Sequence, residues 1–503
     1  MTDHLGLVGG FLTQVREQPD APALVWHDQV TTYAELSAAV GRERERLALL
    51  GVRPGEPVGV LAAKSPAAVA LVLACLTSGR PLLLPSPALA DTTLTELFAQ
   101  AGCRHVLAPE GEPARLLPPA DPDTAALPVP AGAVLLLTTS GSTGLPKIVP
   151  LTSAGVDRFT AWAGPAFGIG PGATVLNHAP LNFDLCLLDV WTTLAHGGRV
   201  VLVDPDHAVN GRHLLGLLQR HQVHVVQAVP MAYGLLEDAA RRAGAELTSV
   251  RHALFTGDAM PDRTLAALPR LFPRARLYNV YGCTETNDSF VHELAPGAVV
   301  FPPAPIGRPL PGVQALVLDA HGDPLEGPGG GELYVSTPFQ APGYLDAARH
   351  RGTFTGHPLG LDDRAWFRTG DLVRRDADGM LHLTGRVDFQ VKVRGTAVNT
   401  AEVERVLQTH PAVLEAGVTA RPDPLTGRKL VASVRRAPGK PLNSLQLKEH
   451  CARNLPKAAV PSELRITDDP LPKTPTGKVD RAALDRAGTP AKAGLATAEG
   501  RTP

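Results

Sequence analysis

A carboxylate lies inside the apolar stretch PLNFDLCLLDVW, at Asp184. The neighbouring side chains are mostly aliphatic or aromatic, which predicts a buried segment. Because burying an unpaired carboxylate costs roughly several kcal/mol, Asp184 needs a partner. Two explanations are open. Asp184 could cap a helix that starts at Leu185 and is closed by Gly197, or it could bind the cationic group of a ligand.

A second stretch, VLLLTTSGSTGLPK, has the composition of a phosphate-binding loop. A strand pattern runs into glycines and hydroxyl residues and ends at Lys147. Glycines let backbone N–H groups converge, hydroxyls add donors, and the lysine adds positive charge. The spacing differs from GxxxxGK[ST], which disfavours a P-loop NTPase. A surface hairpin loop is the alternative interpretation.

Four later motifs place polar groups at strand ends and turns. LYNVYGCTETNDSF offers Tyr281 for stacking on a base and Glu285 for a hard cation near phosphates. RTGDL offers Asp371 as an acceptor for ribose hydroxyls. An aspartate that only stabilises an Asx-turn would give the same sequence pattern. GRVDFQVKVRG contributes Arg386, and PTGKVDR contributes Lys478. Each motif is ambiguous by itself.

The elements that must position these residues follow two patterns. Up to about residue 300, strand and helix patterns alternate, which predicts an α/β fold with parallel sheets covered by helices on both faces. A small antiparallel β unit follows, with Asp378-Gly379 as a hairpin turn. The chain then continues as a compact α+β module. Its last segment has small residues without periodicity and is expected to be disordered.

Length and composition narrow the class of protein. The chain has 503 residues, enough for two or three domains. Its 48 basic and 49 acidic residues are nearly balanced, so neither a nucleic-acid nor a membrane-surface partner is expected. The five cysteines are scattered, which disfavours disulfides and structural zinc. Without a signal-peptide pattern or a long apolar run, a cytoplasmic protein is expected.

Taken in order, the motifs TSGSTGLPK, YGCTET, RTGDL, GRVDFQVKVRG and PTGKVDR resemble those of the adenylate-forming superfamily. This superfamily includes acyl-CoA synthetases, luciferase-like enzymes and the adenylation domains of nonribosomal peptide synthesis. The resemblance implies a large N-terminal domain over residues 1–385, a hinge at 386–388 matching Asp388, and a small mobile domain over 389–486. The tail is then 487–503. ATP and Mg²⁺ are the implied cofactors.

The resemblance also implies roles for individual residues. Glu285 is expected to bind Mg²⁺, and Lys478 to bridge the substrate carboxylate and the α-phosphate, where two anions meet and positive charge is needed. With Thr139 these two form the expected catalytic set. The ATP-binding residues are expected to be Thr139, Ser140, Gly141, Ser142, Thr143, Gly144, Lys147, Gly257, Asp258, Asn279, Tyr281, Thr284, Asp371 and Arg386. The chain departs from the family pattern at Ile148, Ser153 and Asn399, which weakens expectations about docking of the small domain.

Within the superfamily, FDLCLLDVW resembles adenylation domains that select amino acids, in which the aspartate pairs with the substrate ammonium. The expected substrate pocket consists of Asp184, Leu185, Leu188, Ala228, Leu254, Thr256, Val280, Asp288 and Ser289. The chain looks most like free-standing ligases that load proline onto a carrier protein, so L-proline is the expected substrate. If Asp288 faces the pocket, a substrate with a basic or hydroxylated side chain is the alternative expectation.

The expected reaction is ATP-dependent formation of an aminoacyl-AMP with release of pyrophosphate, followed by transfer to a phosphopantetheine thiol. Because only a short tail follows Arg481, the carrier protein is expected to act in trans, with coenzyme A as the alternative acceptor. The small domain is expected to exchange the Lys478 loop for its VKVRG face between the two steps. An acyl- or aryl-CoA ligase and a non-catalytic binding module are the alternatives in function.

Overall fold

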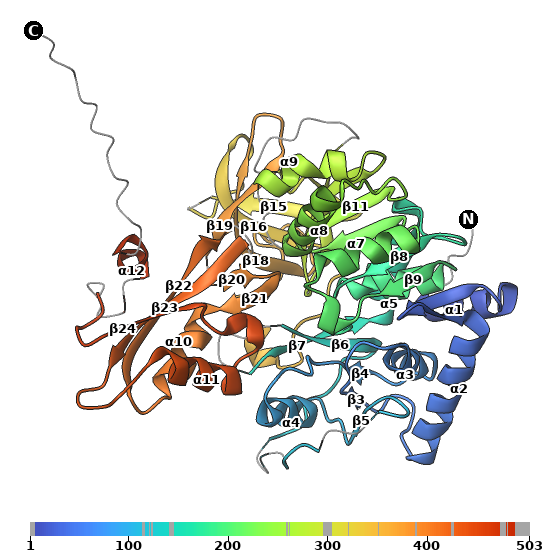
Figure 1. Cartoon of the computed structure of the whole chain (residues 1–503), viewed down its shortest axis with the longest axis horizontal. Coiled ribbons are helices and arrows are strands. Elements are labelled where there is room, and N and C mark those ends of the chain that lie inside the picture. Colours follow the sequence, from blue (N-terminus) through green and yellow to red (C-terminus); the bar gives the residue numbers. More distant parts are fainter. Residues whose placement is uncertain are drawn as a thin grey trace, which may run out of the picture.

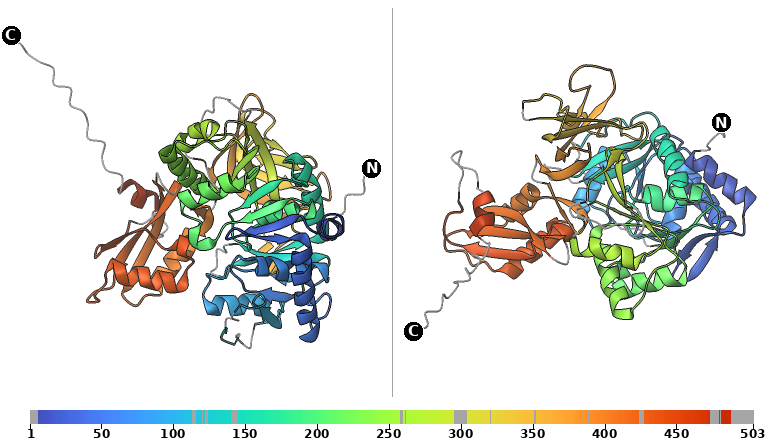
Figure 2. Two further views of the ribbon diagram at one scale, coloured as in Figure 1. Left: turned by 45° about the vertical axis from the view of Figure 1, so that its right-hand side comes forward. Right: turned by 90° about the horizontal axis from the view of Figure 1, so that it is seen from above.

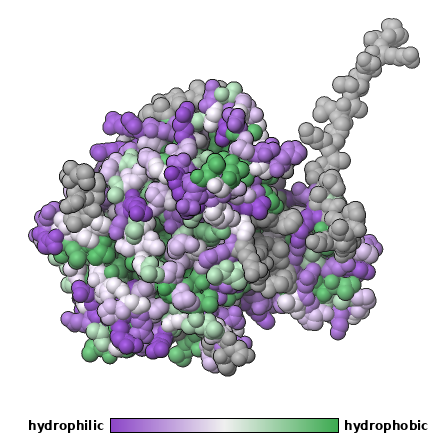
Figure 3. Space-filling model, turned by 180° about the vertical axis from the view of Figure 1, so that it is seen from behind, coloured by the Kyte–Doolittle hydropathy of each residue, from purple (hydrophilic) through white to green (hydrophobic). Residues whose placement is uncertain are grey.

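The computed structural model consists of a large N-terminal unit and a smaller C-terminal unit that lies against one side of it (Figures 1 and 2). It describes residues 6–112, 116–119, 121, 124–139, 145–257, 260, 262–294, 304–319, 321–350, 352–387, 390–423, 427–472, 479 and 481–487. On the face in Figure 3, hydrophobic residues form small patches among hydrophilic ones. No helix in these ranges has the length and apolarity needed to cross a membrane.

The large unit is built around a nine-stranded sheet in the order β14-β13-β12-β11-β10-β8-β9-β1-β2. Its central strands, from β12 to β1, run parallel, whereas β13, β14 and β2 at the edges are antiparallel. The strands are β1 (Pro22–Trp26), β2 (Gln29–Thr32), β8 (Thr174–Asn177), β9 (Arg199–Leu202), β10 (Val225–Ala228), β11 (His252–Thr256), β12 (Arg276–Cys283), β13 (Asn287–Leu294) and β14 (Arg308–Pro309). The predicted parallel sheet is confirmed in its centre.

Helices cover both faces of this sheet. One face packs on α7 (Gly211–Arg220), α8 (Pro230–Ala243) and α9 (Asp262–Leu271), which lie together in Figure 1. The other face belongs to a larger core that also takes in α1 (Leu7–Glu17) and α5 (Ser153–Ala166). The α/β layering predicted from the alternating pattern is therefore confirmed.

A second, five-stranded sheet has the order β5-β3-β4-β6-β7. Its elements are β3 (Val58–Val60), β4 (Leu82–Leu83), β5 (His105–Leu107), β6 (Ala133–Thr139) and β7 (Lys147–Thr152), with helices α2 (Tyr33–Leu49), α3 (Pro66–Thr77) and α4 (Asp91–Gln100). The strands β6 and β7 form an antiparallel pair in which Thr139 lies opposite Lys147. The predicted phosphate loop connects these two strands, and because residues 140–144 lie outside the described part of the chain, its role stays a prediction.

The antiparallel β unit predicted after residue 300 is confirmed. It contains β15 (Gln314–Leu318), β16 (Gly329–Ser336), β17 (Phe354–Thr355), β18 (Trp366–Arg375) and β19 (Leu381–Arg386), with the short helix η3 (Ala347–His350). The hairpin between β18 and β19 turns at Gly379, whose φ of 79° is left-handed and favours glycine.

The C-terminal unit has the predicted α+β composition. It consists of a hairpin of β20 (Gln390–Val393) and β21 (Thr396–Asn399), a sheet of β22 (Val413–Asp423), β23 (Gly427–Arg436) and β24 (Glu463–Thr467), and the helices α10 (Thr400–Gln408), α11 (Ser444–Asn454), η4 (Lys457–Ala459) and α12 (Arg481–Ala487). Of the predicted disordered tail, only Ala487 lies in the described part of the chain. The hinge residue Asp388 lies outside it.

The segment after Asp184 differs from the predicted α-helix. It forms a π-helix, η1 (Leu187–Thr192), followed by the short α6 (Thr193–Ala195). The Thr192 hydroxyl donates to the Leu187 carbonyl at 2.7 Å, five residues earlier, which fits the wider turn. The N-cap residue is Cys186, without a side-chain cap. Asp184 therefore does not cap this helix, and the capping explanation of its presence is wrong.

Candidate active site

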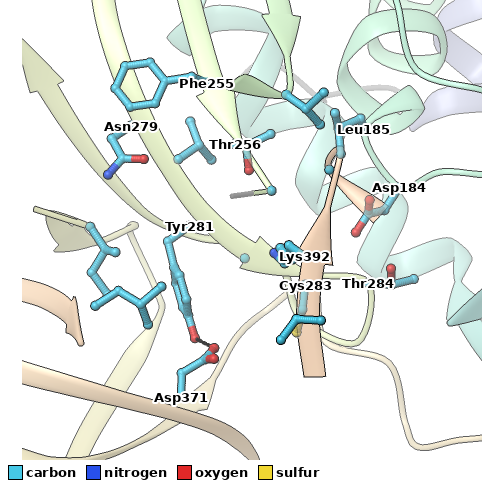
Figure 4. A pocket seen from close by; sticks show the side chains of 18 of the residues that line it. Asp184, Leu185, Phe255, Thr256, Asn279, Tyr281, Cys283, Thr284, Asp371 and Lys392 are labelled. Atoms are coloured by element: carbon cyan, nitrogen blue, oxygen red, sulfur yellow. Dashed lines mark hydrogen bonds between the residues drawn. The ribbon is translucent and has the colours of Figure 1, made fainter. Parts of the chain in front are cut away.

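A cavity of about 680 Å³ opens at the carboxyl ends of β10, β11 and β12 (Figure 4). Ligands bind at this edge in open α/β sheets, because loops leaving parallel strands meet there. The turn before η1, the strands β18 and β19, and the C-terminal unit complete its walls. The expected site residues that line it are Thr139, Asp184, Leu185, Leu188, Thr256, Gly257, Asn279, Val280, Tyr281, Thr284, Glu285, Asp288 and Asp371.

At one end of the cavity, a tyrosine ring and a carboxylate are linked by a hydrogen bond. The Tyr281 hydroxyl on β12 donates to Oδ2 of Asp371 on β18 at 2.5 Å, the bond drawn in Figure 4. The Asn279 amide donates to the Pro305 carbonyl at 2.7 Å, which holds it beside this pair. Asp371 is almost fully buried, and an ionised carboxylate can accept several hydrogen bonds at once. This end offers a stacking surface and an acceptor for hydroxyl donors.

A buried carboxylate lies at the turn between β12 and β13. Glu285 accepts a hydrogen bond from the Tyr344 hydroxyl through Oε1 at 2.8 Å. Lys147 donates to the same tyrosine hydroxyl at 3.3 Å, and its ammonium lies 4.5 Å from the centre of the Tyr344 ring. The tyrosine therefore links the end of the predicted phosphate loop to Glu285.

The groups around Glu285 and Thr139 fit Mg²⁺ and the phosphates of ATP. In the described ranges no cluster of three or more His, Cys, Asp or Glu could hold a metal. Mg²⁺ in nucleotide sites is held by one or two carboxylates plus phosphates, so Glu285 suffices. The Thr139 hydroxyl on the cavity wall is buried without a hydrogen-bond partner among the described atoms, which suits a phosphate oxygen.

Asp184 lies at the other end of the cavity, half-buried beside Thr284 (Figure 4). Burial raises the pKa of its carboxyl, and the nearby Glu285 adds to the rise. A hydrogen bond with the Thr284 hydroxyl, the Lys392 ammonium and the Leu185 backbone N–H lower the same pKa. Asp184 is thus a desolvated acceptor on a ligand-sized cavity, where a carboxylate requires charged or hydrogen-bonding partners.

Gln227 on β10 is a cavity residue that the sequence analysis missed. Its Nε2 donates to the Leu185 carbonyl at 3.0 Å and to Oδ1 of Asp189 at 3.1 Å. Asp189 is fully buried on η1, and Asn177 donates to its other oxygen at 3.3 Å. Gln227 therefore fixes the backbone next to Asp184. A polar residue in the apolar strand VVQAV was the signal that could have identified it.

Three expected pocket residues do not line the cavity. Ala228 points to the opposite face of the sheet because strand neighbours alternate, so its neighbour Gln227 faces the cavity instead. Leu254 is fully buried in the core beneath the cavity. The Ser289 hydroxyl is buried and donates to Thr286 and to the Asn287 carbonyl, both at 3.2 Å. These three assignments are corrected.

A β-bulge at Ser289 decides which way Asp288 points. Tyr281 pairs with Phe290 and Gly282 pairs with Asp288, so Ser289 is an extra residue in β13. A bulge reverses the alternation of side chains. Phe290 consequently packs in a core against one side of the Tyr281 ring, which also lines the cavity, while Asp288 lines the cavity beside Gly282. Asn287 before the bulge has a left-handed φ of 52°.

Several expected site residues and the expected hinge residue are outside the described part of the chain. Ser140, Gly141, Ser142, Thr143, Gly144, Asp258, Asp388 and Lys478 lie outside the described residues. Arg386 pairs through its backbone with Asp371, but its side chain is likewise outside the described part of the chain.

The C-terminal unit reaches the cavity through the β20–β21 hairpin. Val391, Lys392 and Gly395 line the cavity, and Figure 4 shows the strand with Lys392 entering it. Gly395 has a φ of 76° and lies so close to Val229 that an added Cβ would be 2.8 Å from the Val229 Cβ. The VKVRG segment thus seats tightly against the large unit.

This fold and cavity together define an adenylate-forming ligase. The chain belongs to the AMP-binding enzyme family, whose model matches residues 11–345. The model of the AMP-binding enzyme C-terminal domain matches residues 402–478.

Two curated relatives illustrate the range of the family. The chain is 33% identical to an L-proline–(L-prolyl-carrier protein) ligase from Streptomyces coelicolor, over 93% of this chain and 94% of that protein. It is also 33% identical to malpibaldin synthetase from Mortierella alpina, over 94% of this chain but only 9% of that protein.

Solved structures share the fold over nearly the whole chain. The amide bond synthetase McbA from Marinactinospora thermotolerans has a TM-score of 0.82 at 25% identity, covering 96% of this chain and 100% of that one. A nonribosomal peptide synthetase protein with adenylation and PCP domains, bound to a vinylsulfonamide inhibitor, has a TM-score of 0.81 at 27% identity, covering 96% and 84%.

Proposed function

We propose that this enzyme activates an amino acid with ATP and transfers it to the phosphopantetheine thiol of a separate carrier protein. In the first step a substrate carboxylate oxygen attacks the α-phosphorus and the bond to pyrophosphate breaks, leaving an aminoacyl-AMP. In the second step the thiol sulfur attacks the acyl carbon, the thiol proton is released, and AMP departs. Both steps keep the carbon skeleton of the amino acid intact.

The observation that carries the proposal is that Asp184 shares one cavity with the Tyr281–Asp371 pair. The pair suits the base and ribose of a nucleotide, and Asp184 suits an ammonium group. Aryl and fatty acids have no ammonium and would leave the desolvated Asp184 carboxylate without a cationic group from the substrate, which is unfavourable. An amino acid therefore fits better than the acids of acyl- or aryl-CoA ligases.

Charge neutralisation completes the first step. Mg²⁺, when bound near Glu285, supplies positive charge to the phosphates. We assign Lys478 the same task at the α-phosphate, where the attacking carboxylate meets a second anion. Glu285 is held by Tyr344, which fixes the direction of its carboxylate. The Thr139 hydroxyl would donate to a phosphate oxygen.

The two steps are proposed to use different faces of the small domain, residues 389–486, turning about Asp388. The seating of Lys392 and Gly395 at the cavity supports an arrangement for the second step. The Lys478 loop would take the place of the VKVRG segment during the first. We place the boundary of the large domain at residue 385.

L-Proline is one candidate substrate, since it is named for the Streptomyces coelicolor relative. Its secondary ammonium could pair with Asp184. The same relative aligns over 94% of its length and is named for a carrier protein, which supports a separate carrier as acceptor. All five cysteines are free thiols, which supports a reducing compartment such as the cytoplasm.

The proposal is tested by ATP–pyrophosphate exchange with the twenty amino acids and with aryl and fatty acids. We expect exchange that depends on an amino acid, followed by a mass increase on a phosphopantetheinylated carrier when one is added. Exchange with aryl or fatty acids alone would contradict the proposal.

Asp371→Asn should raise the KM for ATP by about tenfold and leave the KM for the amino acid within twofold. The carboxylate accepts from Tyr281 and would accept from the ribose, and a hydrogen bond to a charged group contributes about 1.5–3 kcal/mol. Pyrophosphate exchange at varied concentrations of ATP and of the amino acid measures the two KM values. Tyr281→Phe is the matched control, because it removes the same bond and keeps the ring, so its effect on ATP should be smaller. Equal effects on both substrates would argue against a ribose role.

A further inference from the structure

The cavity contains a second carboxylate, Asp288, for which amino-acid activation alone has no use. The bulge at Ser289 turns Asp288 to the cavity side, where its cross-strand neighbour Gly282 has no side chain to cover it. An added Cβ on Gly282 would lie 2.9 Å from the Cα of Asp288 and would strike the Asn287 carbonyl. Glycine is therefore required at position 282, and the cavity side of Asp288 has no cross-strand side chain over it.

Asp288 is close to two other carboxylates. Its charge acts on Asp189, behind Gln227, and the charge of Asp184 acts on Asp288. Burial, with Asp184 as the second cause, raises the pKa of Asp288 to about 7. No ion pair or hydrogen bond joins its side chain to another residue in the described ranges. A ligand that leaves Asp288 unpaired must tolerate this desolvated acid.

The groups beside Asp288 favour a ligand that donates hydrogen bonds. The amide nitrogen of Gln227 donates hydrogen bonds to the Leu185 carbonyl and to Asp189. A ligand in the cavity would therefore meet the carbonyl oxygen of Gln227, which is an acceptor. An ammonium has three donors and no acceptor, and it also neutralises a carboxylate. A hydroxyl or amide brings an acceptor as well and no charge. The remaining walls nearby, Leu185, Leu188 and Val280, are aliphatic and suit a methylene chain.

We propose that the substrate is a diamino acid, whose α-ammonium pairs with Asp184 and whose side-chain ammonium pairs with Asp288. This rests on the proposed function and narrows its substrate. Proline satisfies Asp184 but has no donor for Asp288, so it is expected to be a poor substrate. The aliphatic walls align the carbon chain between the two carboxylates.

The test is ATP–pyrophosphate exchange with pairs that differ only in the terminal group. The pairs are 2,3-diaminopropionate with 2-aminobutyrate, 2,4-diaminobutyrate with norvaline, and ornithine with norleucine, alongside lysine, homoserine and proline. We expect one diamino acid to exceed its neutral partner in kcat/KM by at least about tenfold, the scale of a charged hydrogen bond. Asp288→Asn should abolish that preference, because it should lower kcat/KM for the diamino acid by at least about tenfold more than for its neutral partner.

Asp363→Asn, an exposed carboxylate on the large unit, is the matched control and should change nothing. Wild-type exchange that favours proline, homoserine or a neutral partner would overturn the inference without any variant. An equal loss for charged and neutral substrates in Asp288→Asn would also overturn it. If none of the amino acids supports pyrophosphate exchange, the proposed function itself is contradicted. The two failures are therefore distinguishable.

Discussion

Asp184→Asn should lower kcat/KM for the amino acid in pyrophosphate exchange by about 10- to 150-fold. The substitution keeps the shape of the side chain and removes the charge, and hydrogen bonds to charged groups contribute about 1.5–3 kcal/mol. The loss is expected to be large because Asp184 is desolvated in the cavity, where its attraction for an ammonium is poorly screened. The KM for ATP should stay within twofold.

The control for this variant is Asp206→Asn, which changes an exposed aspartate that does not line the cavity. It should behave as wild type. A second readout uses a substrate analogue in which hydrogen replaces the α-ammonium. For this analogue, kcat/KM should be equally low in wild type and Asp184→Asn, or higher in the variant. If Asp184→Asn matches wild type with the preferred amino acid, Asp184 does not recognise the ammonium.

Gly395→Ala should depress thioester formation by about 5- to 150-fold while pyrophosphate exchange stays within twofold. The new methyl group would strike the branched Val229 side chain on the cavity rim, and overpacking of this kind costs about 1–3 kcal/mol. The clash exists only when the β20–β21 hairpin is seated. Pre-formed aminoacyl-AMP and holo-carrier, mixed in a single-turnover assay, isolate this second half-reaction.

Gly439→Ala is a closely matched control. Gly439 lies in the same unit with a φ of 72°, nearly that of Gly395, but has no atom within 4 Å of an added Cβ. It therefore carries the same backbone strain without the clash. Val229→Ala added to Gly395→Ala should restore part of the thioester activity. Equal losses in both half-reactions, or no rescue, would show that hairpin seating is not specific to the second step.

Much of the fold could be predicted because local pattern and tertiary structure agree. TTYAELSAAVGRERERLALLG predicts a helix that stops at Gly51, and α2 ends two residues before this glycine, whose φ is 72°. The hairpin at Asp378-Gly379 likewise follows from turn chemistry alone. The ordered motifs were specific enough to identify the family to which the chain belongs.

The remaining features depend on contacts that are distant in sequence. The pattern after Leu185 is compatible with any helix, and η1 widens around Asp189, which Asn177 and Gln227 hold from two different strands. Motif matching chose Ala228 where strand alternation selects Gln227. The direction of Asp288 depends on a bulge at Ser289, which no local propensity reveals.

The bulge at Ser289 also bears on how such an enzyme could change during evolution. Gly282 lies opposite Asp288 and has no side chain, so no cross-strand side chain at this position contacts Asp288. A one-residue insertion or deletion in β13 would instead turn a different side chain toward the ligand. If Asp288 binds the substrate as proposed, the choice of substrate depends partly on the strand register of β13.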